Sequence, residues 1–288
     1  LAARRARAAR DPFFAVLAFR ANHRPYTPAP WHRNASVPAQ GAPRTEAYNA
    51  RGHGHVAWLD ALPPLDAADD AANDAAFLQR WRALMSVDDT AAAVVDELAR
   101  SGELDNTFVV FTSDHGYHLG QFRLPQGKTH LYDFDVRVPF AVRGPGVAPG
   151  GVVRELGGNI DVAPTFAELA GVPRDVIDAT MDGQSFAAQL RARRAGGTKL
   201  DSYPAREHFL VEYYAWTPFP DDYVEGVTRI NSCPLNTYRA VRAERYVYGE
   251  YTNASDWHFE HVSHREYYDL DADPHQLRNA YAELGAAE

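Results

Sequence analysis

The sequence predicts an α/β fold in which a mixed, mostly parallel central sheet is covered by helices and is followed by a small antiparallel sheet. Two continuous apolar runs, residues 12–20 and 108–111, are typical of strands buried on both faces. Residues 75–100, which lie between them, have the apolar spacing of a helix that packs one face on a sheet. Farther along, tyrosine-rich alternating segments indicate antiparallel strands with one covered face. We therefore expect an α/β domain over residues 1–200 and an α+β subdomain over residues 201–288.

The first expected strand ends in a loop that contains a histidine. His23 precedes Pro25 by two positions, and proline restricts its neighbour to an extended conformation. A histidine of this kind, taken alone, is more often a solvated loop residue than a ligand. Residues 27–75 are rich in Pro, Ala, Asp and Gly and predict a long surface excursion of the kind that lines substrate sites. His53 and His55 in this stretch have no carboxylate or cysteine at ligand spacing, so we do not expect them to bind a metal.

The second expected strand runs directly into a tight loop, Ser-Asp-His-Gly at residues 113–116. The carboxyl ends of strands are where open α/β sheets hold their functional residues. Asp114 offers oxygens for a hard cation and His115 adds an acceptor nitrogen, while Lys128 and His130 follow about one loop later as positive or proton-carrying groups. Asp-His-Gly alone is a common turn, but the four side chains together suit a metal-bound anion.

The remaining elements follow from shorter signals. Residues 138–143 predict another strand, and Asp161, Pro164 and Gly171 mark the cap, the first turn and the end of a helix. The C-terminal strands are expected at four segments, residues 209–214, 238–242, 246–251 and 266–270.

Composition and charge exclude several classes of protein. The chain has 288 residues and a formal net charge of −9, which argues against nucleic acid as a partner because duplex binding requires a basic face. The apolar run at residues 13–19 is far too short to cross a bilayer. Cys233 is the only cysteine, so no disulfide can form within the chain, and we interpret this cysteine as structural. Asn34 and Asn253 begin Asn-x-Ser triplets, which would be glycosylated only in a secreted protein.

The pattern around the central loop resembles the sulfatase family of the alkaline-phosphatase superfamily. In that family a strand ends in Ser-Asp-Asn/His-Gly, a glycine-rich segment follows, and a lysine precedes a tyrosine-containing segment and Val-Pro. The matching residues here are 113–116, 118–122, Lys128, 132–135 and Val138-Pro139. Likeness to the N-acetylglucosamine-6-sulfatase and arylsulfatase branches lies in residues 120–125, 131–135 and 143–146. The resemblance extends from Phe13 to about Asn279 and implies an alkaline-phosphatase-like fold.

This resemblance implies a sulfuric ester hydrolase that acts on a sulfated sugar, such as N-acetylglucosamine 6-sulfate, or on aryl sulfates. Asp114 and His115 would be metal ligands with Ca²⁺ as the expected divalent cation, although many sulfatases have asparagine where His115 stands, which leaves the metal open. Lys128 would bind a sulfate oxygen, and His23 would bind sulfate or protonate the leaving oxygen. His130 lies outside the matched pattern and is expected only as a substrate contact. The resemblance also implies a secreted or lysosome-like compartment.

The sequence departs from the family pattern at the nucleophile. Sulfatases oxidise the cysteine of Cys-x-Pro-Ser-Arg to formylglycine, whose hydrate attacks sulfur, whereas Cys233 is followed by Pro-Leu-Asn. The N-terminal acidic pair that completes the family's metal site is also missing. Both elements precede the strand before His23 in the family, and the chain starts at Leu1 rather than methionine. We therefore interpret the chain as a C-terminal portion of a sulfatase, incomplete at its N-terminus and inactive alone.

Two alternative functions stay open. A phosphate or phosphonate ester hydrolase of the same superfamily would use threonine or serine where a sulfatase uses cysteine. A non-catalytic protein would keep the fold only for binding and would have a degraded nucleophile segment. The residue at the family's nucleophile position therefore discriminates among the three.

Overall fold

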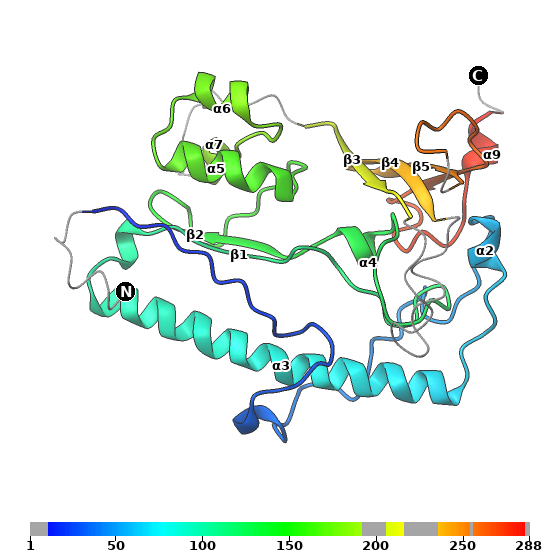
Figure 1. Ribbon diagram of the computed structural model, residues 1–288, viewed down its shortest axis with the longest axis horizontal. Coiled ribbons are helices and arrows are strands. Elements are labelled where there is room, and N and C mark those ends of the chain that lie inside the picture. The colour runs from blue at the N-terminus through cyan, green and yellow to red at the C-terminus, as the bar shows by residue number, and fades with distance from the viewer. Residues whose placement is uncertain (1–10, 192–205, 216–235, 254–255, 286–288) are drawn as a thin grey trace. The chain divides into compact units, whose positions relative to one another are not determined.

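The computed structural model describes residues 11–191, 206–215, 236–253 and 256–285 (Figure 1). Contacts divide the chain into two compact units: Leu1–Ala42 with Ala71–Phe108, and Pro43–Asp70 with Val109–Glu288. The expected domain boundary near residue 200 lies outside the described ranges and stays a prediction. None of the helices in these ranges is both long enough and apolar enough to cross a membrane.

The first unit is built on most of the long helix α3 (Ala67–Arg100). The helix contains the expected residues 75–100 and begins earlier, with acidic residues in its first turn that suit the helix dipole. Gly102 follows its end with a φ of 72°, the left-handed conformation of a helix C-terminus. On α3, Asp89 Oδ2 lies 2.6 Å from His32 Nε2, in the short helix η1 (Pro30–His32). Asp89 is therefore a structural residue of this unit.

The expected buried strand at residues 12–20 is wrong for this structure. The segment has no strand conformation, and its side chains are exposed, as for Phe14 (72%) and Leu17 (55%). A strand is stable only when neighbouring strands pair with its backbone and cover its faces. No strand in the described part of the chain pairs with this segment. The apolar composition of this segment predicts a strand, but it does not identify a second strand with which the segment would pair.

The second unit contains a hairpin of β1 (Val109–Thr112) and β2 (Phe140–Arg143), which confirms both expected strands. Val109 pairs with Arg143 and Thr112 with Phe140 in antiparallel register. The expected mixed α/β fold with a small antiparallel sheet is confirmed. Every pair of named strands in the described ranges is antiparallel, so the expected parallel pairs are not among them. Parallel neighbours need a crossover connection, usually a helix. Residues 113–139 instead fold back and return β2 beside β1.

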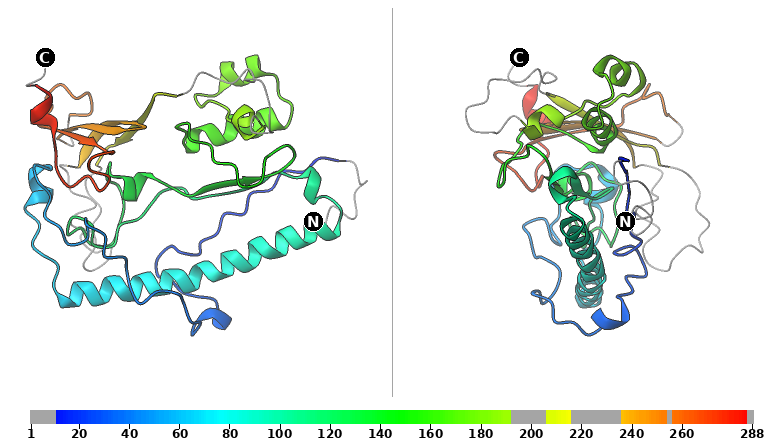
Figure 2. Two further views of the ribbon diagram at one scale, coloured as in Figure 1. Left: turned by 180° about the vertical axis from the view of Figure 1, so that it is seen from behind. Right: turned by 90° about the vertical axis from the view of Figure 1, so that its left-hand side faces the viewer.

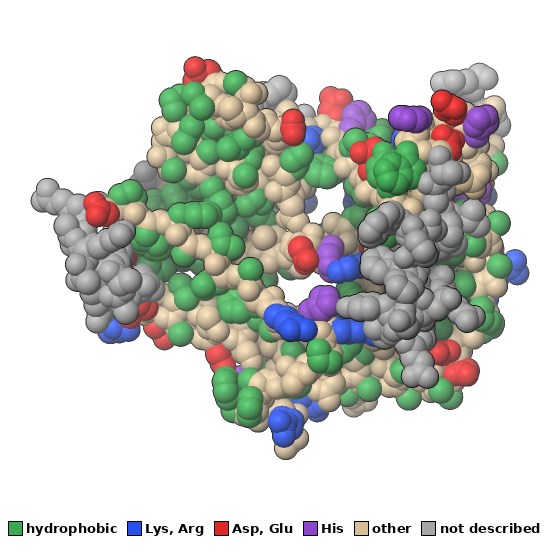
Figure 3. Space-filling model, viewed as in Figure 1, with side chains coloured by type: hydrophobic (Ala, Val, Ile, Leu, Met, Phe, Trp, Pro, Cys, Tyr) green, Lys and Arg blue, Asp and Glu red, His purple; other side chains and the backbone are tan. Residues whose placement is uncertain are grey.

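Short helices follow the hairpin and group beside it (Figures 1 and 2). They are η3 (Asn159–Asp161), α5 (Val162–Leu169), α6 (Arg174–Thr180) and α7 (Ala187–Arg191). Pro164 lies in the first turn of α5 as expected, but the Asp161 side chain does not cap that helix. It accepts hydrogen bonds from the backbone N–H groups of Gly158 and Gln184 at 2.9 and 2.7 Å. Hydrophobic side chains remain exposed over this region, among them Phe111, Phe140 and Ile160 (Figure 3).

The C-terminal sheet confirms the four expected antiparallel strands. They are β3 (His208–Tyr213), β4 (Thr237–Ala243), β5 (Tyr246–Thr252) and β6 (His264–Asp269), paired in that order, with α9 (Tyr281–Leu284) beside β6. The unit's core combines this sheet with residues from α2 (Ala57–Asp60) and from the segment before α4 (Asp133–Val136). Its fully buried aromatic residues include Phe122, Tyr132, Tyr251 and Tyr268.

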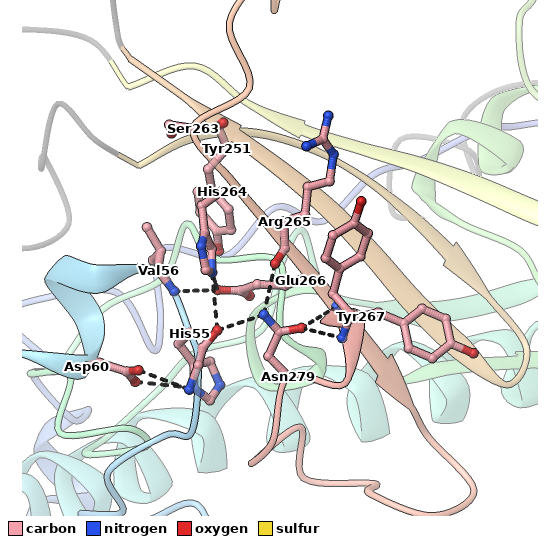
Figure 4. Close-up of polar contacts among 12 residues, drawn as sticks. His55, Val56, Asp60, Tyr251, Ser263, His264, Arg265, Glu266, Tyr267 and Asn279 are labelled. Atoms are coloured by element: carbon pink, nitrogen blue, oxygen red, sulfur yellow. Dashed lines mark hydrogen bonds and ion pairs between the residues drawn. The ribbon is translucent and has the colours of Figure 1, made fainter. Parts of the chain in front are cut away.

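A polar cluster joins residues 54–60 to β6 (Figure 4). Glu266, fully buried on β6, accepts a hydrogen bond of 2.7 Å from the backbone N–H of Val56. Asn279 donates one of 2.7 Å to the carbonyl oxygen of Gly54. Because buried polar groups are costly unless paired, these bonds fix the segment against the sheet.

Candidate active site

The candidate site lies in the loop that follows β1, and a glycine sets its path. The backbone N–H of Gly116 donates a hydrogen bond of 2.7 Å to the carbonyl oxygen of Asp135. A Cβ atom at this position would lie 2.1 Å from the carbonyl oxygen of Phe134. Only glycine allows so close an approach of two backbones. The loop carrying Asp114 and His115 is thereby held against residues 134–135.

The two expected metal ligands are adjacent and partly open to solvent. The Asp114 side chain is 81% exposed, and its Oδ2 lies 3.2 Å from Nε2 of His115. His115 Nδ1 donates to the carbonyl oxygen of Gly116 at 2.7 Å, so the lone pair of the neutral ring is on Nε2. Partial burial raises the pKa of the Asp114 carboxyl, but the charge that His115 carries when it is protonated and the backbone N–H of His115 outweigh it and keep this pKa below its usual range. Asp114 is therefore ionised at neutral pH.

Lys128 contacts His115 from the end of the loop that joins residues 118 and 127. The backbones of His118 and Gly127 exchange two hydrogen bonds, of 2.9 and 3.2 Å, which close this loop just before the lysine. Lys128 Nζ then lies 2.5 Å from Nε2 of His115. The structure thus brings Asp114, His115 and Lys128 together, as their pattern in the sequence predicted.

Asn159 is a site residue that the sequence reading missed. Its side-chain amide donates hydrogen bonds of 3.0 and 2.9 Å to the carbonyl oxygens of Ser113 and Asp114. The sequence shows only an asparagine just before a helix start, and that position suggests capping rather than contact with a distant loop. No local signal in the sequence pairs Asn159 with residues 113–114.

Three other residues of the sequence-based prediction are exposed. His23 is exposed in the first unit, where its Nδ1 donates to the carbonyl oxygen of Arg24 at 3.1 Å, and its sulfate role stays a prediction. Asn34 and Asn253 are exposed, as glycosylation would require. Cys233 lies outside the described residues.

His130 is buried instead of open to a substrate. Only 1% of its surface is exposed, and its ring lies beside those of Trp58 and His118 at centroid distances of 5.7 and 5.2 Å. Its backbone N–H donates to Asp135 Oδ2 at 3.0 Å. This burial argues against the expected direct substrate contact, which stays untested.

His53 and His55 have different surroundings. The His53 side chain is exposed, whereas His55 is buried and donates through Nε2 to the carbonyl oxygen of Gln276 at 2.9 Å. Nδ1 of His55 lies 3.5 Å from Oδ1 of Asp60, an ion pair visible in Figure 4. Both ring nitrogens of His55 thus face acceptors, and its role is structural.

The residues at the loop fit part of a divalent cation site. Asp114 presents an ionised, exposed carboxylate, and His115 presents a lone pair beside it. Two residues cannot complete the shell of about six to eight ligands that Ca²⁺ takes. The Lys128 ammonium, next to His115, would repel a bare cation but attract an anion bound to it. The arrangement therefore suits a cation together with an anionic ligand.

Comparison with known proteins agrees with this chemistry. The sulfatase family model matches residues 2–172, and the model of the N-sulphoglucosamine sulphohydrolase C-terminal region matches residues 120–288. N-acetylglucosamine-6-sulfatase of Capra hircus is 36% identical over 294 residues, covering 93% of this chain and 48% of the goat protein. An extracellular sulfatase SULF-1 homolog of Drosophila melanogaster is 37% identical over 204 residues, covering 70% of this chain and 18% of that protein.

A solved structure has a related fold. The structure of BT4656 in complex with its substrate D-glucosamine-2-N,6-O-disulfate is 25% identical, with a TM-score of 0.52, and the match covers 74% of this chain and 37% of that chain. This chain spans 48% of the length of the goat relative, about half. Since the sulfatase model matches residues 2–172, more than half of the sequence, the chain belongs to the sulfatase family.

Proposed function

We propose that the protein is a sulfuric ester hydrolase whose substrate is a sulfated sugar of the glucosamine 6-sulfate type. The observation that carries this proposal is the contact between Lys128 Nζ and His115 Nε2, beside the Asp114 carboxylate. A pair of potential cation ligands next to an ammonium group suits a metal-bound sulfate. Relatives named N-acetylglucosamine-6-sulfatase and a structure holding a disulfated glucosamine support the sugar substrate.

The side chains take separate roles in this proposal. Members of the sulfatase family generally bind a divalent cation, and Asp114 and His115 would hold it here, with Ca²⁺ as the expected ion. The bound cation supplies charge neutralisation where the transition state gathers negative charge. Lys128 binds a sulfate oxygen, and His23 binds sulfate or protonates the leaving alcohol oxygen.

The nucleophile of the family is a formylglycine made from the cysteine of Cys-x-Pro-Ser-Arg. Sulfate ester hydrolysis by this protein requires that residue in the intact enzyme. Location in a secretory or lysosome-like compartment follows from the same family proposal, and the exposed Asn34 and Asn253 would then be glycosylated.

The test is a comparison of substrates and variants in the intact protein. We expect turnover of N-acetylglucosamine 6-sulfate or an aryl sulfate, and much slower turnover of a phosphonate monoester. Lys128→Ala should lower kcat/KM by at least about 100-fold, the loss typical of one group that stabilises transition-state charge. Arg245→Ala removes a cation that is 73% exposed and pairs with Asp271, so it should leave the rate unchanged. Faster phosphonate turnover, or full activity of Lys128→Ala, would contradict the proposal.

A further inference from the structure

Three potential metal ligands lie together inside the second unit. His118, His130 and Asp135 each offer one ligand atom, and these atoms all lie within 4.8 Å of one another. The three residues are buried, with 0%, 1% and 3% of their surfaces exposed. Both carboxylate oxygens of Asp135 lie close to His118 Nδ1, at 2.9 and 3.0 Å. The cluster is therefore compact, and protein rather than solvent surrounds it.

The other ring nitrogen of His118, Nε2, has no partner among the described residues. Donation from Nδ1–H to Asp135 fixes the tautomer and leaves a lone pair on Nε2. This Nε2 atom is buried and has no hydrogen-bond partner in the described part of the chain. A buried polar atom without a partner costs about 1–3 kcal/mol. Such an atom in a native protein commonly marks the place of an ion or water.

The donor atoms select the class of ion. Imidazole nitrogens are typical ligands of Zn²⁺ and related transition metals, whereas Ca²⁺ prefers oxygen ligands alone. A histidine whose second nitrogen is hydrogen-bonded to a carboxylate, as His118 is to Asp135, is also the usual form of a zinc ligand. We propose that His118, through Nε2, and His130 bind a buried divalent transition-metal ion of the Zn²⁺ class, with Asp135 orienting His118 and no ligand taken from Asp114 or His115.

The ion would hold together the loop that presents Lys128. His118 lies at the start of that loop, where it pairs with Gly127, and His130 follows the lysine by two residues. A single ion bound by both histidines would hold the two ends of the loop together, while Asp135 keeps His118 in place through its hydrogen bond with Nδ1. The proposed role is thus structural: the metal positions Lys128 and takes no part in the reaction.

Calorimetric titration of Zn²⁺ into the intact, chelator-treated protein tests this site. The double variant Asp114→Ala/His115→Ala removes the proposed catalytic cation site, and we expect it still to bind one Zn²⁺ per chain. Adding His130→Ala should weaken that binding at least about 100-fold, because one of the two histidine ligands is lost. His130→Cys should retain tight binding, since a thiolate is a zinc ligand.

Two further observations decide the result. His53→Ala, which removes an exposed histidine, should bind Zn²⁺ as tightly as its parent. Circular dichroism should show that the His130 variants are folded. Absence of Zn²⁺ uptake by the double variant, or unchanged affinity in His130→Ala, would mean that the three residues form only a buried hydrogen-bonded cluster. Because no readout depends on sulfate ester turnover, failure here leaves the proposed function untouched, and the reverse also holds.

Discussion

The side-chain amide of Asn159 donates a hydrogen bond of 2.9 Å to the backbone carbonyl oxygen of Asp114. The same nitrogen donates to the carbonyl oxygen of Ser113 at 3.0 Å, so one amide group holds two successive carbonyls of the site loop. These bonds fix the backbone on which the Asp114 carboxylate stands. Asn159 is therefore a positioning residue for the proposed cation ligand.

Asn159→Ala should weaken Ca²⁺ binding by the intact protein about 10- to 100-fold, the effect typical of a residue that orients a metal ligand. The free energy of unfolding should fall by about 1 kcal/mol or less, because Asn159 is exposed. Calorimetric Ca²⁺ titration and urea unfolding measure the two effects. The same substitution at the exposed Asn106 serves as the control and should change neither. Unaltered Ca²⁺ affinity in Asn159→Ala would show that Asp114 needs no such support.

Gly116→Ala should destabilise the protein by about 3 kcal/mol, because its Cβ would lie 2.1 Å from the Phe134 carbonyl oxygen and the loop must move. Thermal unfolding with calorimetric detection measures the loss. Gly285→Ala is the matched control, since a Cβ there meets no atom within 4 Å, and it should stay within about 0.5 kcal/mol of the parent. Equal stability of the two variants would mean that the loop does not pack as closely as this structure has it.

Local signals in the sequence were enough to locate most elements and to bring the residues of the candidate site to notice. The alternation of tyrosine-rich segments fixed the positions of β3 to β6, because alternation needs only one covered face. The end of an apolar run located Asp114 and His115. The strand prediction for residues 12–20 was wrong for a related reason. An apolar run indicates that a segment is covered, but it does not identify the residues that cover it.

Long-range contacts account for what the sequence could not predict. Asn159 meets Asp114 across 45 residues, and His118 meets Asp135 across 17, with no periodicity that links either pair. The position of His130 just after Lys128 does not reveal that its ring is buried, and its contact with substrate stays a prediction. Side-chain direction in an irregular loop depends on packing, which spacing alone does not encode.

The His55–Asp60 pair should make stability depend on pH. Burial lowers the pKa of His55, but the contact with Asp60 and the charges of Glu266 and Asp60 outweigh it and raise this pKa above its ordinary value of about 6.5. Partial burial raises the pKa of Asp60, but His55 outweighs it and lowers this pKa. The contribution of His55 to the free energy of unfolding is complete below about pH 6.5 and is lost as the pH rises through the folded pKa of the histidine. The contribution of Asp60 is complete above about pH 3.9 and is lost as the pH falls through the folded pKa of the aspartate.

Asp60→Asn should therefore cost most where both groups are charged. We expect a loss in the free energy of unfolding of the order of 1 kcal/mol near pH 5.5 and a smaller loss at a pH above the folded pKa of His55, where the ring is neutral in both proteins. Urea unfolding at the two pH values measures the difference, and NMR titration of His55 should show its pKa falling in the variant. A loss that is equal at both pH values would mean that Asp60 acts only through its hydrogen bond from the Gly54 N–H, which has a length of 3.1 Å.

Asn279→Asp should be strongly destabilising although the two side chains have the same shape (Figure 4). The Nδ2 group donates hydrogen bonds of 2.7 and 2.8 Å to the carbonyl oxygens of Gly54 and Arg265, and a carboxylate would set an acceptor against both. Two lost bonds of about 1 kcal/mol each, with the added repulsion, predict a loss of about 2–4 kcal/mol in the free energy of unfolding. Urea unfolding measures it, with the same substitution at the exposed Asn106 as the control. A loss that shrinks at low pH, where the introduced carboxyl is protonated and regains one donor, would confirm that the missing N–H groups are the cause. A loss no larger than at Asn106 would mean that Asn279 does not hold residue 54 against β6.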